Sequence, residues 1–356
     1  MSLKIRNITV CALQASLIQP FRIATGQHNS LDNLLITLKL SDGTVGFGEA
    51  AIASHITGET IAQTKENLRT AAEHLKGCQA KDYLKISHWL QEAFPRNRAA
   101  SAAMEMALLD ALTRQMKIPL WRMFGRRCRR LKTDITIVVG SLQETKNNVN
   151  QFYRRGFRSF KIKIGWDMDL DFQRVAAAAK LAPKAQIILD ANQAYDAAQA
   201  LKFLKMLDKA RIKVDLIEQP VPKADIDGLK RVTRLSKVPV CADESASSLG
   251  DVIGLIKNKA VNAVNIKLMK TGIIHSFEIA CLARASNLKL MIGGMMESNV
   301  AMTAAAHLAA GLGCFDFIDL DTPFFIQGEE ARNPYLTSSG IYDLTKAKTG
   351  IGIKPL

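Results

Sequence analysis

Residues 187–192 read Ile-Ile-Leu-Asp-Ala-Asn, an apolar run of strand length that ends in a carboxylate. Seven other short runs rich in Val, Ile and Leu occur along the chain, and amphipathic segments of about a dozen residues separate them. This alternation predicts βαβ units and a parallel sheet. The eight predicted strands are 135–139, 160–164, 187–190, 216–218, 238–242, 263–266, 289–292 and 317–320.

The spacing of these strands favours a closed barrel. Their first residues lie about 22 to 29 residues apart, the length of one strand, one helix and two short loops. An open doubly wound sheet is the alternative. However, the nearest match to a dinucleotide-binding loop, Gly46-Phe47-Gly48, lies in a predicted hairpin and does not open a helix, so we dismiss a Rossmann site. The predicted fold class is α/β, a TIM-like (β/α)8 barrel with an N-terminal α+β capping domain.

The N-terminal third of the chain has a different pattern. Strands are predicted at 5–17, 34–40 and 45–49, and helices at 59–75, 81–94 and 98–115. The last helix is predicted to have an apolar stripe on Ala102, Met106, Leu109 and Ala111. Because 356 residues exceed the usual size of a single core, we predict three segments. These are a capping domain at 1–125, the barrel at 126–322 and a segment at 323–356 that returns to the capping domain.

Composition restricts the class of protein. The net charge is +15, and the densest basic run is Arg126, Arg127, Arg129, Arg130 and Lys132. Aromatic residues make up 6% of the chain and none interleaves with that run, which argues against nucleic-acid binding. A solvated face or a contact within a homo-oligomer is the preferred interpretation.

Membrane insertion and disulfide chemistry are not indicated either. No stretch reaches about 18 uncharged apolar residues, so we expect an unanchored, cytoplasmic protein. The six cysteines show no C-x-x-C spacing, which predicts free thiols. Cys241 could be a nucleophile, but a core position on a strand is the preferred interpretation.

Charged residues end successive predicted strands. Strand 187–190 ends at Asp190, strand 216–218 ends at Glu218, and Asp243 follows the next strand. The carboxyl ends of barrel strands meet at one mouth, where three carboxylates would repel one another unless a cation lay between them. An all-oxygen set suits Mg²⁺. Structural ion pairs with nearby lysines are the alternative.

Lysines approach the same mouth from two sides. Lys161 and Lys163 alternate along one strand and therefore point the same way, and Lys267 follows a strand across the barrel. We expect neighbouring ammonium groups to lower each other's pKa. A substrate between Lys163 and Lys267 would have a base on each face, as a 1,1-proton transfer at a carbon next to a carboxylate requires.

These residues resemble a known family. Lys161-Ile-Lys163, Asp190-Ala-Asn192, Ile217-Glu218-Gln219-Pro220, Ala242-Asp243-Glu244-Ser245 and Asn265-Ile-Lys267 are similar to the muconate lactonizing enzyme subgroup of the enolase superfamily. The resemblance implies one Mg²⁺ held by Asp190, Glu218 and Asp243, with Lys163 and Lys267 as the acid/base pair and Lys161 beside the substrate carboxylate. Asn192, Asn265 and Glu244 would support these groups.

Within the subgroup, the chain resembles the dipeptide epimerases, including the L-Ala-D/L-Glu epimerases. Asp319-Leu320-Asp321 is similar to the Asp-x-Asp that binds a dipeptide's ammonium group in those enzymes. Specificity would come from loops 21–26 and 55–59, and Gly26 stands where the Ala-Glu epimerases have a glutamate-pairing arginine. The remaining residues expected near the substrate are Arg22, which could replace that arginine from a different register, Thr136, Met296 and Glu297.

Two other classes of function remain open. o-Succinylbenzoate synthase and muconate cycloisomerase would use the same lysines and metal, but their substrates carry no ammonium group for Asp319 and Asp321 to bind. A non-catalytic binding protein on the same scaffold is a further alternative, because a fold alone does not establish a function. The sequence does not identify the side chains of the dipeptide.

Overall fold

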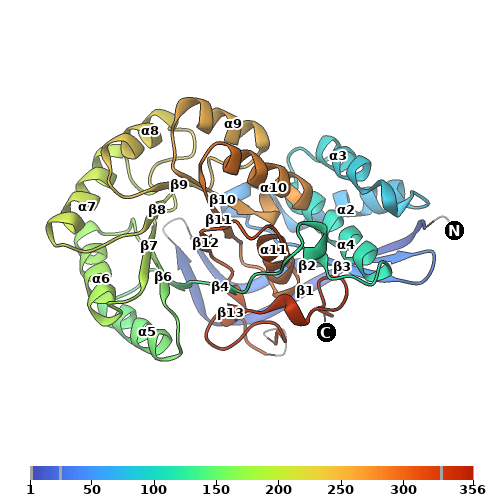
Figure 1. Ribbon diagram of the computed structural model, residues 1–356, viewed down its shortest axis with the longest axis horizontal. Helices are drawn as coiled ribbons and strands as arrows, with labels where there is room; N and C mark the ends of the chain where they lie inside the picture. The colour runs from blue at the N-terminus through green and yellow to red at the C-terminus, as the bar shows by residue number, and fades with distance from the viewer. Residues whose placement is uncertain (1–2, 24–25, 329–331, 356) are drawn as a thin grey trace.

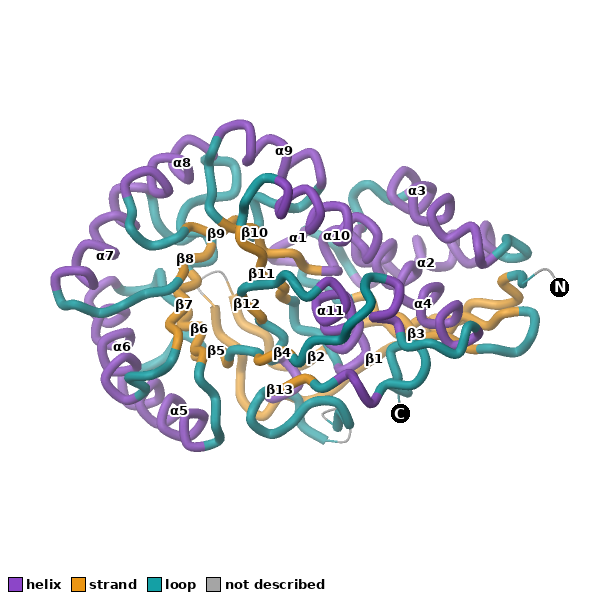
Figure 2. Tube along the Cα trace, in the orientation of Figure 1, coloured by secondary structure: helices purple, strands orange, loops and turns teal. Residues whose placement is uncertain are grey.

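The computed structural model describes residues 3–23, 26–328 and 332–355. The chain begins with a three-stranded antiparallel sheet of β1 (Ile5–Ile23), β2 (Gly26–Leu40) and β3 (Val45–Ala50). The first hairpin is longer than expected, because pairing continues past residue 17 to Ile23↔Gly26. Figure 2 traces this ribbon from the capping sheet to the barrel strands, where Leu17 forms a β-bridge with Ile326. Ala24 and Thr25 of the predicted specificity loop lie outside the described residues.

Four helices complete the cap, and the longest is buried on all sides. They are α1 (Ser54–Thr57), α2 (Ile61–Leu75), α3 (Tyr83–Ala93) and α4 (Arg98–Gln115). Every residue of α4 from 99 to 113 is buried. The four residues of the predicted apolar stripe are buried, but burial extends around the whole helix. The helix packs against β3 on one side and against α10 of the barrel on another, so it has no wide solvent face.

The eight predicted strands form one parallel sheet in sequential order, and the predicted barrel architecture is confirmed. Figure 1 shows helices α5 to α9 as an arc outside the strands. A backbone hydrogen bond of 2.8 Å from Asp134 N to Ile318 O joins the first strand to the last. The strands are β5 (Ile135–Ile137), β6 (Ser159–Lys163), β7 (Gln186–Asp190), β8 (Leu216–Glu218), β9 (Val240–Ala242), β10 (Ala263–Lys267), β11 (Lys289–Gly293) and β12 (Phe317–Ile318).

Helices follow seven of these strands, and a 3-10 turn, Thr322–Phe324, follows the eighth. The helices are α5 (Leu142–Arg154), α6 (Met168–Leu181), α7 (Ala197–Lys209), α8 (Ile226–Leu235), α9 (Leu249–Asn258), α10 (Leu268–Ala285) and α11 (Asn299–Leu312). Side-chain caps begin most of them, for example a capping box between Ser141 and Glu144 at α5. Several strands are shorter than the apolar runs predicted. In β9 this has a local cause, because Pro239 has no N–H to donate to a ladder.

The end of the chain crosses back to the beginning of the barrel and to the cap. Strand β13 (Ile341–Tyr342) pairs with β4 (Leu131–Lys132). Farther on, Gly350 exchanges backbone hydrogen bonds with the segment after α4, from Gly350 N to Ile118 O (2.9 Å) and from Leu120 N to Gly350 O (2.8 Å). The last residues are therefore anchored on the N-terminal part of the chain.

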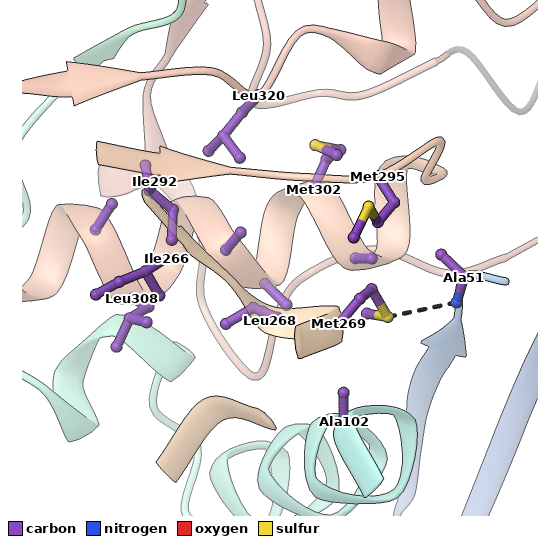
Figure 3. Packing of buried hydrophobic residues seen from close by; sticks show 14 of the residues in the cluster. Ala51, Ala102, Ile266, Leu268, Met269, Ile292, Met295, Met302, Leu308 and Leu320 are labelled. Atoms are coloured by element: carbon purple, nitrogen blue, oxygen red, sulfur yellow. Dashed lines mark hydrogen bonds between the residues drawn. The ribbon is translucent and has the colours of Figure 1, made fainter. Parts of the chain in front are cut away.

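Cap and barrel share one apolar core. Figure 3 shows Ala51 from the end of β3 and Ala102 from α4 facing Met269 of α10, beside Ile266 and Ile292 of the barrel strands. The Ala51 N–H lies 3.3 Å from the Met269 sulfur. Burial of this shared surface ties the position of the cap to that of the barrel mouth.

Two expectations from composition can be compared with the structure. The cysteines of the described residues are free thiols, and Cys241 is buried within the barrel sheet, as predicted. Within residues 3–23, 26–328 and 332–355, no helix is both long enough and apolar enough to cross a bilayer.

The close approach of β3 and α4 gives a stability prediction. A Cβ at Gly48 would lie 2.0 Å from the backbone oxygen of Ala103, so Gly48→Ala must force the helix away from the sheet. We expect a loss of about 1–3 kcal/mol in the free energy of unfolding, measured by urea denaturation. The matched control is Gly254→Ala in α9, where nothing lies within 4 Å. The control should gain about 0.5–1 kcal/mol, and equal effects of the two changes would contradict this packing.

Candidate active site

A cavity lies between the carboxyl ends of the barrel strands and the cap. Its floor is polar and comes from the barrel. Its roof is apolar apart from His28 and comes from the β1–β2 ribbon, α1 and the loop after β11. Such a combination of apolar wall and convergent polar groups is typical of a small-molecule site. The floor contains Thr136, Lys161, Lys163, Asn192, Lys267, Asp319 and Asp321, and the roof contains Phe21, Ile23, Ala53, Ile56, Met295 and Met296.

Lys161 is the centre of the floor. Its Nζ lies 3.0 Å from Asp190, 2.8 Å from Glu218 and 2.7 Å from Asp319, and the side chain is fully buried. The expectation of a lowered pKa was wrong for this residue. Burial lowers the pKa of Lys161, but the carboxylates of Asp190, Asp319 and Glu218 more than offset burial, and the pKa lies well above its ordinary value.

Lys163 and Lys267 lie on opposite walls of the barrel. Lys163 ends β6 and Lys267 ends β10, and three strands separate these two in each direction around the sheet. The Nζ of Lys163 bonds Asp190 Oδ2 at 2.7 Å, and the Nζ of Lys267 bonds Asp243 Oδ2 at 2.7 Å. Burial lowers the pKa of Lys267, but the charge of Asp243 raises it by more than burial lowers it. The pKa of Lys267 therefore also lies above its ordinary value. A molecule in the cavity would have one lysine on each side.

The three predicted metal ligands are brought to one edge of the sheet, at the ends of β7, β8 and β9. Burial raises the pKa of Asp190 and Asp243, but the adjacent lysines outweigh burial and leave both pKa values below the ordinary range. Burial, together with Asp190, raises the pKa of Glu218 to about 7. Glu218 Oε2 lies 2.8 Å from Lys161 Nζ but has no aligned hydrogen bond, so a buried carboxylate oxygen remains available to a cation. An all-oxygen set with such an atom fits Mg²⁺.

Side-chain and backbone donors hold these carboxylates in place. Asn265 Nδ2 donates to Glu218 Oε1 at 2.7 Å, and Asn192 N donates to Asp190 Oδ1 at 3.0 Å. The sequence analysis missed Lys270, which is buried and donates to Asp243 Oδ1 (2.7 Å), Asp243 O (2.7 Å) and Asn265 O (2.9 Å). The three-residue spacing from Lys267 at the start of α10 could have indicated Lys270. Glu244 does not line the cavity, and its Oε1 accepts from Gln193 at 3.2 Å.

Asp319 and Asp321 lie on the wall formed by β12, next to β5. Asp319 accepts from Lys161, and Asp321 Oδ2 accepts from Thr136 N at 2.6 Å. Burial, and then the charge of Asp319, raises the pKa of Asp321 to about 7. The structure adds a third acid, Asp134, that the sequence analysis missed. One of its carboxyl oxygens lies within 4.8 Å of an oxygen of Asp319 and of an oxygen of Asp321. The wall therefore has a high density of carboxyl groups and is suited to a cation.

The cap residues divide into those that face the cavity and those that do not. Phe21 and Ile23 line the cavity, whereas the intervening Arg22 is exposed and its Nε donates to Gln27 at 3.1 Å on the paired strand. Alternation along β1 explains the difference, since neighbouring side chains point to opposite faces. Gly26 pairs with Ile23 in the ribbon and is not among the lining residues.

The loop after β11 is held by buried cap residues that the sequence analysis missed. Asn33 Nδ2 donates to Met296 O at 2.9 Å and to Glu49 at 2.7 Å, and Glu49 accepts from Ser298 N at 2.8 Å. Met296 lines the cavity as predicted. Glu297 does not line the cavity; it accepts from Met295 N at 2.6 Å, and burial raises its pKa to about 8.

Comparison with known proteins agrees with this geometry. The family described as Mandelate racemase / muconate lactonizing enzyme, N-terminal domain, matches residues 5–125, and the family described as Enolase C-terminal domain-like matches residues 144–356. The chain belongs to the mandelate racemase / muconate lactonizing enzyme family. The resemblance seen in the strand-end motifs is thereby confirmed.

Similar members of this family are named for dipeptide chemistry. The hydrophobic dipeptide epimerase of Citrifermentans bemidjiense is 47% identical over 99% of this chain and 98% of its own length. The aromatic dipeptide epimerase of Herpetosiphon aurantiacus is 39% identical over 93% and 92%. A crystal structure of a dipeptide epimerase from Enterococcus faecalis, complexed with Mg and the dipeptide L-Leu-L-Tyr, has a TM-score of 0.93 at 30% identity and covers 98% of this chain and 99% of that one.

His307 is a buried histidine that does not line the cavity. His307 Nδ1 accepts from Trp121 N at 3.1 Å, so Nε2 carries the proton and donates to Ile351 O at 3.2 Å. The ring is completely buried, and burial lowers its pKa to about 4. His307 is therefore a packing residue of the shared core.

His307 gives a pH-dependent prediction. The unfolded chain takes up a proton on histidine near pH 6.5, while the folded protein does so only near pH 4, so stability from this residue is complete above pH 6.5 and decreases as the pH falls. The loss is about 2 kcal/mol between pH 6.5 and pH 5. The free energy of unfolding is measured with urea at pH 7 and at pH 5. Its decrease between these two pH values should be smaller in His307→Gln than in the unchanged protein, by about that amount. Exposed His88→Gln is the control, and identical pH slopes for all three proteins would contradict the assignment.

Proposed function

We propose that this protein is a Mg²⁺-dependent dipeptide epimerase that inverts the α-carbon of the C-terminal residue by 1,1-proton transfer. One observation carries the proposal. Lys163 and Lys267 face each other across a cavity whose third wall, Asp319 and Asp321, is suited to an ammonium group. The names of the similar proteins from C. bemidjiense and H. aurantiacus support the same substrate class.

The roles follow from position. Asp190, Glu218 and Asp243 would hold Mg²⁺, which supplies positive charge beside the substrate carboxylate and makes the α-proton more acidic. Lys161, between the metal ligands and Asp319, donates to the negative charge that develops on that carboxylate. One of Lys163 and Lys267 removes the α-proton, and the other returns a proton to the opposite face of the resulting enediolate. Asp319 and Asp321 bind the free N-terminus.

The cavity roof favours apolar side chains on the dipeptide. Phe21, Ile23, Ile56 and Met296 face the position of the substrate, and no arginine of the described residues lines this cavity. Arg22 points away, so the replacement for a glutamate-pairing arginine that we considered from the sequence finds no support. A hydrophobic C-terminal residue is therefore the proposed preference over glutamate.

The alternatives within the family fit the site less well. A succinylbenzoate or muconate substrate has no cation to place beside Asp319 and Asp321, and two buried acids would repel the additional negative charge. A non-catalytic scaffold fits poorly with the buried, mutually oriented lysines and carboxylates of the floor, which are costly to maintain without a function.

The test of activity is solvent exchange. The protein with Mg²⁺ is incubated in D₂O with a mixed library of L,L-dipeptides, and mass spectrometry detects gain of one deuteron. We expect exchange to concentrate in dipeptides with apolar C-terminal residues, with slower exchange in L-Ala-L-Glu. Absence of exchange in every dipeptide would overturn the proposed function, and exchange confined to acidic dipeptides would overturn the proposed specificity.

Lys270 provides a separate prediction about the metal. Because Lys270 holds Asp243 Oδ1 and the Asp243 backbone, Lys270→Met frees this ligand to reorient, and the Mg²⁺ affinity should fall about 10- to 100-fold. Isothermal calorimetry of the protein with Mg²⁺ measures the change without any substrate. Exposed Lys257→Met in α9 is the charge-matched control and should bind Mg²⁺ as before. Equal affinities for the two variants would contradict the role of Lys270.

A further inference from the structure

Asp134 is a buried acid that the proposed mechanism does not use. It precedes β5, has no exposed surface, and neither of its carboxyl oxygens has a hydrogen-bond partner among the described residues. Its backbone N–H donates to Ile318 O at 2.8 Å, which fixes the main chain from which the side chain extends. One of its oxygens lies within 4.8 Å of an oxygen of Asp319 and of Asp321.

The two neighbouring acids have donors, unlike Asp134. Asp319 accepts from Lys161 Nζ at 2.7 Å, and Asp321 accepts from Thr136 N at 2.6 Å. Lys161 is committed to Asp319, Asp190 and Glu218 at 3.0 Å or less. The charged groups facing Asp134 are therefore the two acids of its own wall, Lys161 and, farther off, Glu218.

An ionised Asp134 is physically unfavourable in this position. A buried carboxylate without a donor is strongly unfavourable, and two like charges close by make it more so. Burial, followed by the charges of Asp319 and Asp321, raises the pKa of Asp134 well above its ordinary value. A neutral carboxylic acid has an O–H, and the acceptors close to it are the oxygens of Asp319 and Asp321.

We propose that Asp134 is a positioning residue that, as a neutral carboxylic acid, donates a hydrogen bond to the Asp319–Asp321 pair. The bond fixes the orientation of the oxygens of the pair, so that both side chains can face a cation in the cavity. The three acids then present two negative charges instead of three, which suits one ammonium group beside Lys161. Only the identity of that cation, the substrate's N-terminus, rests on the proposed function.

The first test observes the proton directly and needs no activity. A protonated carboxylic acid has a C=O stretching band in the infrared that is separate from the bands of ionised carboxylates and shifts in D₂O. The difference spectrum between the unchanged protein and Asp134→Asn at neutral pH should contain one such band. A difference spectrum with only ionised carboxylate bands would show that Asp134 is charged and would overturn the inference, whether or not the protein epimerises dipeptides.

The second test separates hydrogen bonding from charge. The side-chain amide introduced by Asp134→Asn keeps a donor, whereas Asp134→Leu removes it, so the first variant should retain kcat/KM for a dipeptide within about threefold and the second should lose about 10- to 100-fold. Mg²⁺ affinity, measured by calorimetry, should stay unchanged in Asp134→Asn. Equal losses in both variants would mean that a negative charge is needed and would contradict the inference. A second Mg²⁺ site that disappears in Asp134→Asn would make the three acids a metal site and would contradict it also.

Discussion

The ion-pair network around Lys161 is the constraint on which the site depends. A single buried ammonium group lies within 3.0 Å of carboxylates from β7, β8 and the segment after β12. Without Lys161, the buried carboxylates of Glu218 and Asp319 would have no cation paired with them among the described residues, which is costly in a dry barrel. Lys161 thereby links the metal ligands on one side of the cavity to the cation-binding wall on the other. A substrate with a carboxylate and an ammonium group has the charges to match both sides.

The cap contributes specificity because it is built into the same core as the barrel. Met269 packs against Ala51 at the end of β3 (Figure 3). Glu49 and Asn33 bind the backbone of the loop that carries Met296. The apolar roof is consequently fixed relative to the lysines. A change in Phe21 or Ile23 can alter which side chain fits without moving the groups that transfer the proton.

Much of the fold and of the catalytic floor could be predicted because the signals are local. The strands around Asp190, Glu218 and Lys267 are short apolar runs with a charge at one end, and parallel strands bring such ends to one edge. The β1–β2 extension to Gly26 was missed because residues 26–33 of its second strand are mostly polar, and Pro20 lies within the first. Residues whose partners are far away in the sequence were missed as well. Asn33 donates to Met296, 263 positions away. Asp134 stands out as a site residue only because the fold places it beside Asp319. Three expectations stay predictions. They are the division into segments 1–125, 126–322 and 323–356, the absence of nucleic acid as a partner, and the oligomeric state.

The central claim is that Lys163 and Lys267 act on opposite faces of one α-carbon. It is tested most directly by following α-proton exchange in D₂O separately for the L,L and L,D epimers of one accepted dipeptide, with Lys163→Ala and with Lys267→Ala. The account predicts that neither variant interconverts the epimers, and that each still exchanges the α-proton of one epimer, a different one in each variant. Loss of exchange from the same epimer in both variants would place the two lysines on one face and contradict the account.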